Sequence, residues 1–328
     1  MRAFVVSEVD DTLSMSVREV EAVASDASDI LVSVDYSGVN FKDAMVAASK
    51  SRVRRVSSLV GGVDAAGTVR RSSDASLPEG ARVAVHGGTL GVARDGGFAQ
   101  SIYSPANYVT ALPDSISSRV AMIIGTAGFT AMESLLALED RGLEAGSEVL
   151  VTGATGGVGS LAVALLAANG YRAVASTGSL TATAWLIERG AVRVIGRDDV
   201  ADNPGRVLAS ETWAAAIDCV GGDTLAQILR SLRYGGAVAA SGLVGSAELS
   251  TTVYPFITRS VALLGIDSVE ATRSTRQRVW SALGAVATRI DFEALVDREV
   301  QLEELTSAFE DLRQGNTRGR ILVNPTPG

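Results

Sequence analysis

The 328-residue sequence contains one cysteine and one histidine. A single cysteine excludes an internal disulfide, and a zinc site needs about three or four protein ligands, mostly Cys and His. Because Cys219 and His86 lie far apart in unlike contexts, we expect no metal site. Cys219 lies in the apolar run AAAIDCV, which predicts a buried and inert thiol, and His86 ends the strand-like RVAVH, which predicts a loop edge.

The sequence also lacks long runs of charge and long apolar runs. Its net charge is −8 and no basic face is evident, so we expect no nucleic-acid partner. The basic cluster RVRRV at 52–56 predicts a solvated loop. No stretch approaches the ~20 apolar residues of a membrane span, and the start MRAFVVSEVD lacks the features of a signal peptide. We therefore expect a cytoplasmic protein without membrane association.

Apolar residues are abundant, at 47%, beside 20% charged residues. This balance is typical of a globular protein, and the length suits two domains. The first third has short Val-rich runs separated by Gly, Pro, Asp and Ser, which predict a β-barrel-like domain at 1–120. Its expected strands are Ala3–Ser7, Ile30–Ser37, Gly67–Arg70, Arg82–His86 and Ala99–Tyr103. We expect the tail, 268–328, to complete this domain with two helices and the strand GRILVN.

The segment 121–267 has a different pattern of apolar residues. From Glu148 onward, continuous apolar strands alternate with amphipathic helices, which indicates a parallel sheet covered on both faces. Six strands in this order predict an α/β, doubly wound Rossmann domain. The expected strands are EVLVT, RAVAST, RVIG, AAAIDCVG, GAVAASG and VALLGID, and the helix DTLAQILRSLRYG is expected to end at Gly235.

The clearest local motif is VLVTGATGGVGSLAVALLAANG at 149–170, which predicts a strand, a glycine-rich turn and a helix. Gly153, Gly156 and Gly159 have the spacing that lets a backbone turn sharply and approach a pyrophosphate. The helix start would offer free N–H groups and a positive dipole to phosphates. A tight strand–helix turn without a ligand is the alternative, but within a six-strand pattern the motif favours a dinucleotide.

The second strand predicts which dinucleotide binds. An NAD site usually has Asp or Glu at the end of this strand, whereas here the sequence reads AVASTGSL. The hydroxyls of Thr177 and Ser179 and the amide of Gly178 suit a 2′-phosphate, which a carboxylate would repel. Arg197 follows the neighbouring third strand and would add a charge-assisted bond, unless it is a surface residue beside Asp198 and Asp199. The pattern therefore favours NADPH over NADH.

Longer segments carry a family resemblance. They are DYSGVNFKDAM, GGVDAAGTV, AMIIGTAGFTAMESLLALED, VTGATGGVGSLAVALL, WAAAIDCVGG, YGGAVAASGL, TTVYPFITRSVALLGIDSV and GRILV. In these the chain resembles the zinc-free medium-chain dehydrogenase/reductase superfamily, in the acrylyl-CoA reductase or quinone oxidoreductase-like group. The resemblance implies a GroES-like barrel beside a Rossmann domain, with the cofactor in the cleft. It also implies NADPH-dependent reduction of an activated carbon–carbon double bond, as in acrylyl-CoA.

The resemblance implies a set of cofactor-binding residues but names no catalytic acid. The phosphates would meet Thr155, Gly156, Gly157 and Val158, and the adenosine end would meet Thr177, Gly178, Ser179 and Arg197. The nicotinamide end would lie near Phe41, Thr130, Leu243, Ile257 and Ser268, with Arg320 reaching the cofactor from the barrel. Lys42 and Asp43, beside Phe41, are expected to form a structural ion pair.

Three positions depart from the family pattern. Phe41 replaces the usual Tyr of NYKD, and a phenyl ring cannot donate a proton. Thr177-Gly178-Ser179 replaces Ser-Gly-Arg, so that Arg197 becomes the main positive charge for a 2′-phosphate. The loop HGGTLGVARDGGFAQ is shorter than the family's loop, which borders the substrate.

These departures leave several functions open. The substrate would be an enoyl thioester, an enone or a quinone, so that an NADPH:quinone reductase is an alternative to an acrylyl-CoA reductase. A protein that holds NADPH without useful turnover is a further alternative. VALLGID is expected to be the last strand of the sheet, and pairing of its apolar edge would give a homodimer.

Overall fold

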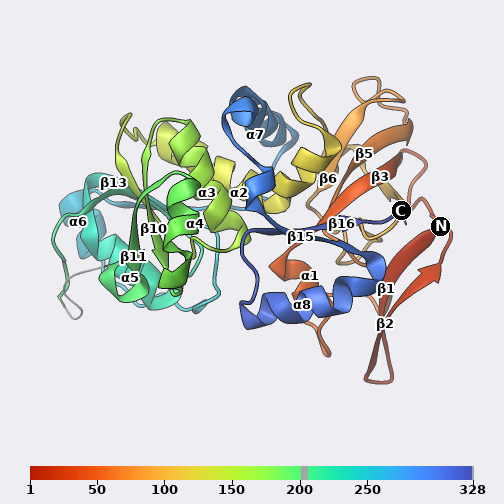
Figure 1. Cartoon of the computed structure of the whole chain (residues 1–328), viewed down its shortest axis with the longest axis horizontal. Coiled ribbons are helices and arrows are strands. Elements are labelled where there is room, and N and C mark those ends of the chain that lie inside the picture. Colours follow the sequence, from red (N-terminus) through yellow and green to blue (C-terminus); the bar gives the residue numbers. More distant parts are fainter. Residues whose placement is uncertain (201–205, 327–328) are drawn as a thin grey trace. The chain divides into compact units, whose positions relative to one another are not determined.

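The structure is a computed structural model that describes residues 1–200 and 206–326. The chain divides into two compact units, one formed by 1–127 with 268–328 and the other by 128–267. Each unit contains its own β-structure (Figure 1). Each also contains its own apolar clusters of buried side chains.

The first unit is rich in β-structure. In its larger sheet the strand order is β15-β16-β3-β5-β6-β8, with β7 also paired to β3, and a smaller sheet has the order β2-β1-β4. The strands are β1 (Arg2–Val9), β2 (Thr12–Glu19), β3 (Ile30–Val39), β4 (Ser58–Val60), β5 (Asp64–Arg71), β6 (Arg82–His86), β7 (Ser101–Ser104), β8 (Val109–Ala111), β15 (Val296–Gln301) and β16 (Arg320–Asn324). Because β16 pairs with β3, the C-terminal tail completes the sheet of the N-terminal segment.

Helices cover parts of the first unit. They are α1 (Phe41–Val46), α7 (Arg273–Val286) and α8 (Leu305–Gln314). The short α1 and the distant α8 lie side by side (Figure 1). Arg313 on α8 donates a 2.6 Å hydrogen bond to the carbonyl oxygen of Ala44 on α1. This contact packs one face of α1 inward and leaves the opposite face exposed.

The second unit contains a parallel sheet with the strand order β11-β10-β9-β12-β13-β14 in the described part of the chain. Its strands are β9 (Glu148–Val151), β10 (Arg172–Thr177), β11 (Ala191–Gly196), β12 (Trp213–Asp218), β13 (Leu232–Ala240) and β14 (Ala262–Gly265). The helices are α3 (Gly157–Ala168), α4 (Thr183–Glu188), α5 (Gly222–Ser231) and α6 (Tyr254–Arg259) (Figure 1). The order of the strands is that of a doubly wound sheet, which confirms the predicted fold class.

Helix α2 (Ser118–Asp140) is long and apolar enough to span a membrane by length and composition, contrary to the expectation of no such stretch. Most of it is buried inside the protein, as in a core helix. The helix is also broken at Gly125, where φ is +50°. The cytoplasmic location stays a prediction.

One expected boundary was wrong. Helix α5 ends at Ser231 rather than at Gly235, because Leu232 already pairs with Trp213 in the sheet and begins β13. His86 ends β6 where a loop begins, as expected, and its side chain is fully buried there. The strand β2 had not been expected at all.

Candidate functional site

The glycine-rich turn between β9 and α3 is built from backbone that approaches itself closely. Gly153 has φ +60°, a region that residues with a side chain rarely adopt. A Cβ placed on Gly159 would lie 2.8 Å from the Cα of Ala154 and closer still to the carbonyl oxygen of Gly153. The first turn of α3 therefore packs directly on the preceding turn, and glycine is required at both positions.

The N-terminal end of α3 is open to a ligand. Gly156 is the N-cap, it is exposed, and no side chain caps this end of the helix. Thr155, Gly157 and Val158 are half-exposed around it. Because the first N–H groups of a helix have no partner within the helix, they and the positive end of the dipole favour an anion here. This end of α3 fits a pyrophosphate.

A buried aspartate that the sequence reasoning missed fixes the turn beside the glycine-rich turn. Asp218, at the end of β12, accepts a 2.6 Å hydrogen bond from the hydroxyl of Thr152 and a 2.8 Å bond from the N–H of Gly221. Burial raises the pKa of Asp218. The Thr152 hydroxyl in turn accepts the N–H of Cys219, at 3.0 Å. The two turns are thus tied together by one side-chain network.

At the end of β10 the structure brings together the residues expected at the adenosine end. Thr177 is buried and its hydroxyl accepts the N–H of Ser179 at 3.0 Å, whereas Gly178 is exposed. A Cβ on Gly178 would lie 2.6 Å from Nη2 of Arg197, so the Arg197 guanidinium lies over this glycine.

Arg197 is exposed, and among the described residues its guanidinium has no hydrogen-bond or ion-pair partner. The neighbouring Asp199 carboxylate does not pair with it and instead accepts the N–H of Gly196 at 3.0 Å. Arg197 is thus a surface residue beside Asp198 and Asp199, and within the described part of the chain it pairs with neither carboxylate. A positive charge without a partner, beside hydroxyl groups, suits a phosphate.

The residues expected near the nicotinamide fall in both units. In the second unit, Thr130 is buried on α2, whereas Leu243 is 60% exposed after β13 and Ile257 is 72% exposed on α6. In the first unit, Phe41 is 45% exposed at the start of α1 and Ser268 is buried. Exposure leaves the side chains of Phe41, Leu243 and Ile257 available to a ligand.

Arg320 is buried in the first unit and is held by groups of that unit. Its Nε donates to the carbonyl oxygen of Ile123 at 3.0 Å, and its Nη1 donates to Oδ1 of Asn40 at 3.1 Å. Nη2 lies 3.7 Å from the carboxylate of Asp64 and makes no hydrogen bond. Arg320 is therefore the positively charged partner of the buried Asp64 carboxylate.

Asp64 and Asp43 form a buried acidic pair beside this arginine. Asp64 accepts the N–H and the hydroxyl of Thr126, where the second part of α2 begins after the break at Gly125. Asp43 accepts the N–H groups of Asn40 and Val63, at 2.8 and 2.9 Å. Burial and, secondarily, the charge of Asp64 raise the pKa of Asp43 to about 7. The pair stabilises the junction of β5, α1 and α2.

The expected ion pair between Lys42 and Asp43 is not formed. Asp43 is buried and bonded to backbone N–H groups, whereas Lys42 is half-exposed and has no partner among the described residues. Consecutive residues of a helix are about 100° apart around its axis, so the side chains of Lys42 and Asp43 point to different sides of α1.

The described residues contain no group of three or more His, Cys, Asp or Glu side chains that would hold a metal ion. The His86 side chain is buried, and its Nδ1 lies 2.9 Å from Nη1 of Arg276. Burial lowers the pKa of His86 well below its usual value. Cys219 is half-buried rather than buried, and loss of solvation raises its pKa to about 12. Because neither residue belongs to a ligand cluster, the described chain does not fit a zinc ion.

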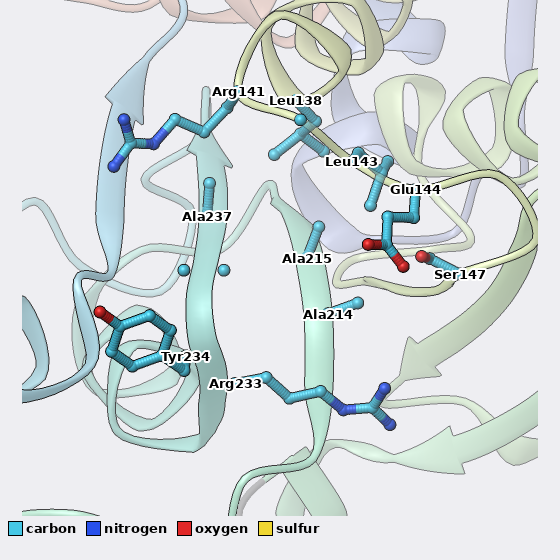
Figure 2. Close-up of a pocket in the computed structure, with 13 residues that line it drawn as sticks. Leu138, Arg141, Leu143, Glu144, Ser147, Ala214, Ala215, Arg233, Tyr234 and Ala237 are labelled. Carbon is cyan, nitrogen blue, oxygen red and sulfur yellow. The ribbon is translucent and has the colours of Figure 1, made fainter.

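A pocket of about 230 Å³ lies in the second unit, away from the glycine-rich turn. It is lined by Leu138, Arg141, Gly142, Leu143, Glu144, Ser147, Ala214, Ala215, Arg233, Tyr234, Gly235, Gly236 and Ala237. Ser147 precedes β9, and Ala214 and Ala215 lie in the first half of β12, whereas the glycine-rich turn follows the carboxyl end of β9. Figure 2 shows Arg141 and Arg233 pointing in different directions, so they do not converge on one anion. The pocket is separate from the candidate cofactor site.

Two family models match the chain. The model described as an alcohol dehydrogenase GroES-like domain matches residues 26–114, and the model described as a zinc-binding dehydrogenase matches residues 157–285. Together they cover β3 to β8 of the first unit and most of the second unit from the start of α3 onward.

Named relatives are similar over almost the whole chain. YhfP of Bacillus subtilis, whose name assigns it to the quinone oxidoreductases, is 43% identical over 95% of both chains. The acrylyl-CoA reductase AcuI of Ruegeria pomeroyi is 40% identical over 94% of both chains.

Solved structures of two such proteins contain nicotinamide cofactors. The yhdH oxidoreductase of Salmonella enterica, in complex with NADP, has a TM-score of 0.93 with 38% identity over 99% of both chains. The structure of B. subtilis YhfP with NAD bound has a TM-score of 0.94 with 42% identity over 98% of both chains. The chain is thus similar to one structure that contains NADP and to another that contains NAD.

Proposed function

Because the chain belongs to the medium-chain dehydrogenase/reductase superfamily, in its quinone oxidoreductase-like group, it is an oxidoreductase that uses a nicotinamide cofactor, and we propose that it reduces an enoyl-CoA thioester such as acrylyl-CoA with NADPH. The observation that carries the NADPH proposal is the unpartnered Arg197 guanidinium over Gly178. The 40% identity to an acrylyl-CoA reductase supports the choice of acceptor.

In this proposal the second unit binds the phosphates and the adenosine. The N-terminal end of α3, from Thr155 to Val158, binds the pyrophosphate through backbone N–H groups. Arg197 and the hydroxyls of Thr177 and Ser179 bind the 2′-phosphate. The family pattern adds contacts near the nicotinamide from Phe41, Thr130, Leu243, Ile257, Ser268 and Arg320.

When bound, reduced nicotinamide supplies a hydride to the β-carbon of the double bond. Negative charge then develops on the thioester oxygen and must meet hydrogen-bond donors, and the α-carbon takes a proton. The phenyl ring of Phe41 has no proton to give, so its contribution is packing. The chain's main task in this proposal is binding and orientation.

A second candidate function is NADPH:quinone reduction, which the 43% identity to YhfP favours. The two candidates differ in acceptor and share the cofactor site. A test compares NADPH oxidation by the purified protein with acrylyl-CoA, crotonyl-CoA and benzoquinone as separate acceptors. Rapid turnover of acrylyl-CoA supports the thioester proposal, and turnover of benzoquinone alone supports the second candidate. NADPH binding without turnover of any acceptor would indicate a binding protein.

The edge strand β14 leads us to propose a homodimer. Within the described residues β14 pairs only with β13, which leaves its other edge free, and its Leu263 side chain is 37% exposed. A free apolar edge favours pairing with a second copy of the same strand about a two-fold axis. Sedimentation that gives a monomer at micromolar concentration would contradict this proposal.

A further inference from the structure

The loop that follows α1 presents two arginines without partners. Arg52 and Arg55 are exposed, and among the described residues neither guanidinium forms a hydrogen bond or an ion pair. The arginine between them behaves differently. Arg54 is buried, pairs with Glu8 and donates a 2.7 Å hydrogen bond to the carbonyl oxygen of Val46.

Local contacts hold this loop against the end of α1. The hydroxyl of Ser51 donates to the carbonyl oxygen of Met45 at 2.7 Å and accepts the N–H groups of Val53 and Arg54 at 3.1 Å each. The N–H of Arg55 donates to the carbonyl oxygen of Val92 at 2.9 Å. Val53 also packs against an apolar cluster that contains Val92. Because the backbone of the loop is fixed, the two outward arginines are held near the end of α1.

The exposed face of α1 is apolar. Phe41 and Met45 are four residues apart, so they share one face of the helix, and they are 45% and 39% exposed. Asp43, Ala44 and Val46 occupy the buried face. The bond from Ser51 to the backbone carbonyl of Met45 joins the loop that carries the two arginines to this part of α1.

We propose that the Phe41–Met45 face and the pair Arg52 and Arg55 bind the coenzyme A part of the substrate. The apolar face contacts the pantetheine arm, and the two guanidinium groups bind the phosphates at the far end of the coenzyme, with the planar, bidentate geometry for which arginine is suited. This inference rests on the proposed function, and it gives the cluster RVRRV a role beyond that of a solvated loop.

The local charge of the loop supports this occupant. The chain as a whole has a net charge of −8, and in this loop Arg54 is neutralised by Glu8, but no described residue neutralises Arg52 or Arg55. Two neighbouring cations that lack such a partner are complementary to an anion with more than one charge. A quinone carries no such charge, so the arginines would discriminate between the two classes of acceptor.

The test compares Arg52→Ala and Arg55→Ala, singly and together, with acrylyl-CoA and with the acrylyl thioester of N-acetylcysteamine, which lacks the phosphates. For the coenzyme A thioester we expect KM to rise roughly tenfold for each arginine removed, with kcat nearly unchanged. For the truncated thioester we expect no change. Arg289→Ala is the matched control, because Arg289 is also exposed and without a partner among the described residues, and it should behave as the wild type.

Calorimetric titration with propionyl-CoA, dephospho-CoA and inorganic phosphate separates this inference from the proposed function. If the wild type reduces no thioester, the proposed function fails, yet weaker propionyl-CoA binding by the double variant still supports the subsite. Arg52→Lys with Arg55→Lys should restore part of the affinity. Equal propionyl-CoA affinity in wild type and double variant, or an equal rise in KM for both thioesters, would overturn the inference.

Discussion

Replacing Arg197 with alanine is expected to weaken NADPH binding and to leave NADH binding nearly unchanged. The guanidinium lies over Gly178 and has no partner among the described residues, so its removal should not break a contact within the protein. The two cofactors differ only in the 2′-phosphate. A selective loss therefore reports on that phosphate rather than on stability.

The magnitude follows from the kind of bond. A hydrogen bond to a charged group contributes about 1.5–3 kcal/mol, and each 1.4 kcal/mol changes a dissociation constant about tenfold. Because Arg197 is exposed and solvent screens its charge, we take the lower end of this range. The dissociation constant for NADPH should rise roughly tenfold, and the preference for NADPH over NADH should fall by the same factor.

Fluorescence or calorimetric titration with each cofactor measures both constants. Arg193→Ala is the control, since this arginine lies on β11, the strand that Arg197 follows, and its guanidinium pairs with Glu148, 3.5 Å away. The reasoning would be refuted by an equal loss of affinity for NADPH and NADH, or by no loss at all. A smaller rise in the constant at high salt than at low salt is also expected.

Three further predictions concern the glycine-rich turn, the buried acid pair and the sheet edge. Gly159→Ala should abolish cofactor binding and lower the melting temperature. Gly265→Ala is the control and should do neither, because a Cβ at this position meets open space. Cofactor binding by Gly159→Ala as strong as that of the wild type would contradict the close packing of the turn. Burial raises the pKa of Asp43 in the folded chain to about 7, above its value in the unfolded chain. The folded chain therefore holds this proton longer, and the free energy of unfolding should fall by roughly 1 kcal/mol per pH unit as the pH rises from about 4 to 7. Denaturation curves of Asp43→Asn should lack this contribution, and parallel pH profiles would count against the raised pKa. Leu263→Lys on β14 should shift the protein from dimer to monomer in sedimentation, with Ile187→Lys on α4 as an equally polar control; an unchanged dimer would move the interface elsewhere.

The sheet of the second unit was predictable because its apolar strands are buried on both faces and leave continuous runs in the sequence. The boundary between α5 and β13 was not, since Leu232 continues the helical pattern of α5 and only its pairing with Trp213 makes it a strand. The strand β2 left a weak signal in the alternation of Leu13, Met15 and Val17, which pack against a core cluster across a half-exposed strand.

The candidate site was predictable where neighbouring strands bring residues together. Arg197 was expected beside Gly178 because the second and third strands of such a sheet are adjacent, and the structure places them in contact. The bond between Thr152 and Asp218 joins positions 66 residues apart, and no local pattern indicates it. Burial of Asp43 and Asp64 is equally invisible in the sequence, because both are ordinary acidic residues until the fold surrounds them.

The most direct test of the central claim is the ratio of kcat/KM for acrylyl-CoA reduction with NADPH and with NADH, with propionyl-CoA measured as the product. The account predicts one propionyl-CoA formed for each NADPH oxidised, and a ratio that clearly favours NADPH. Cofactor oxidation without propionyl-CoA, or a ratio that favours NADH, would contradict it.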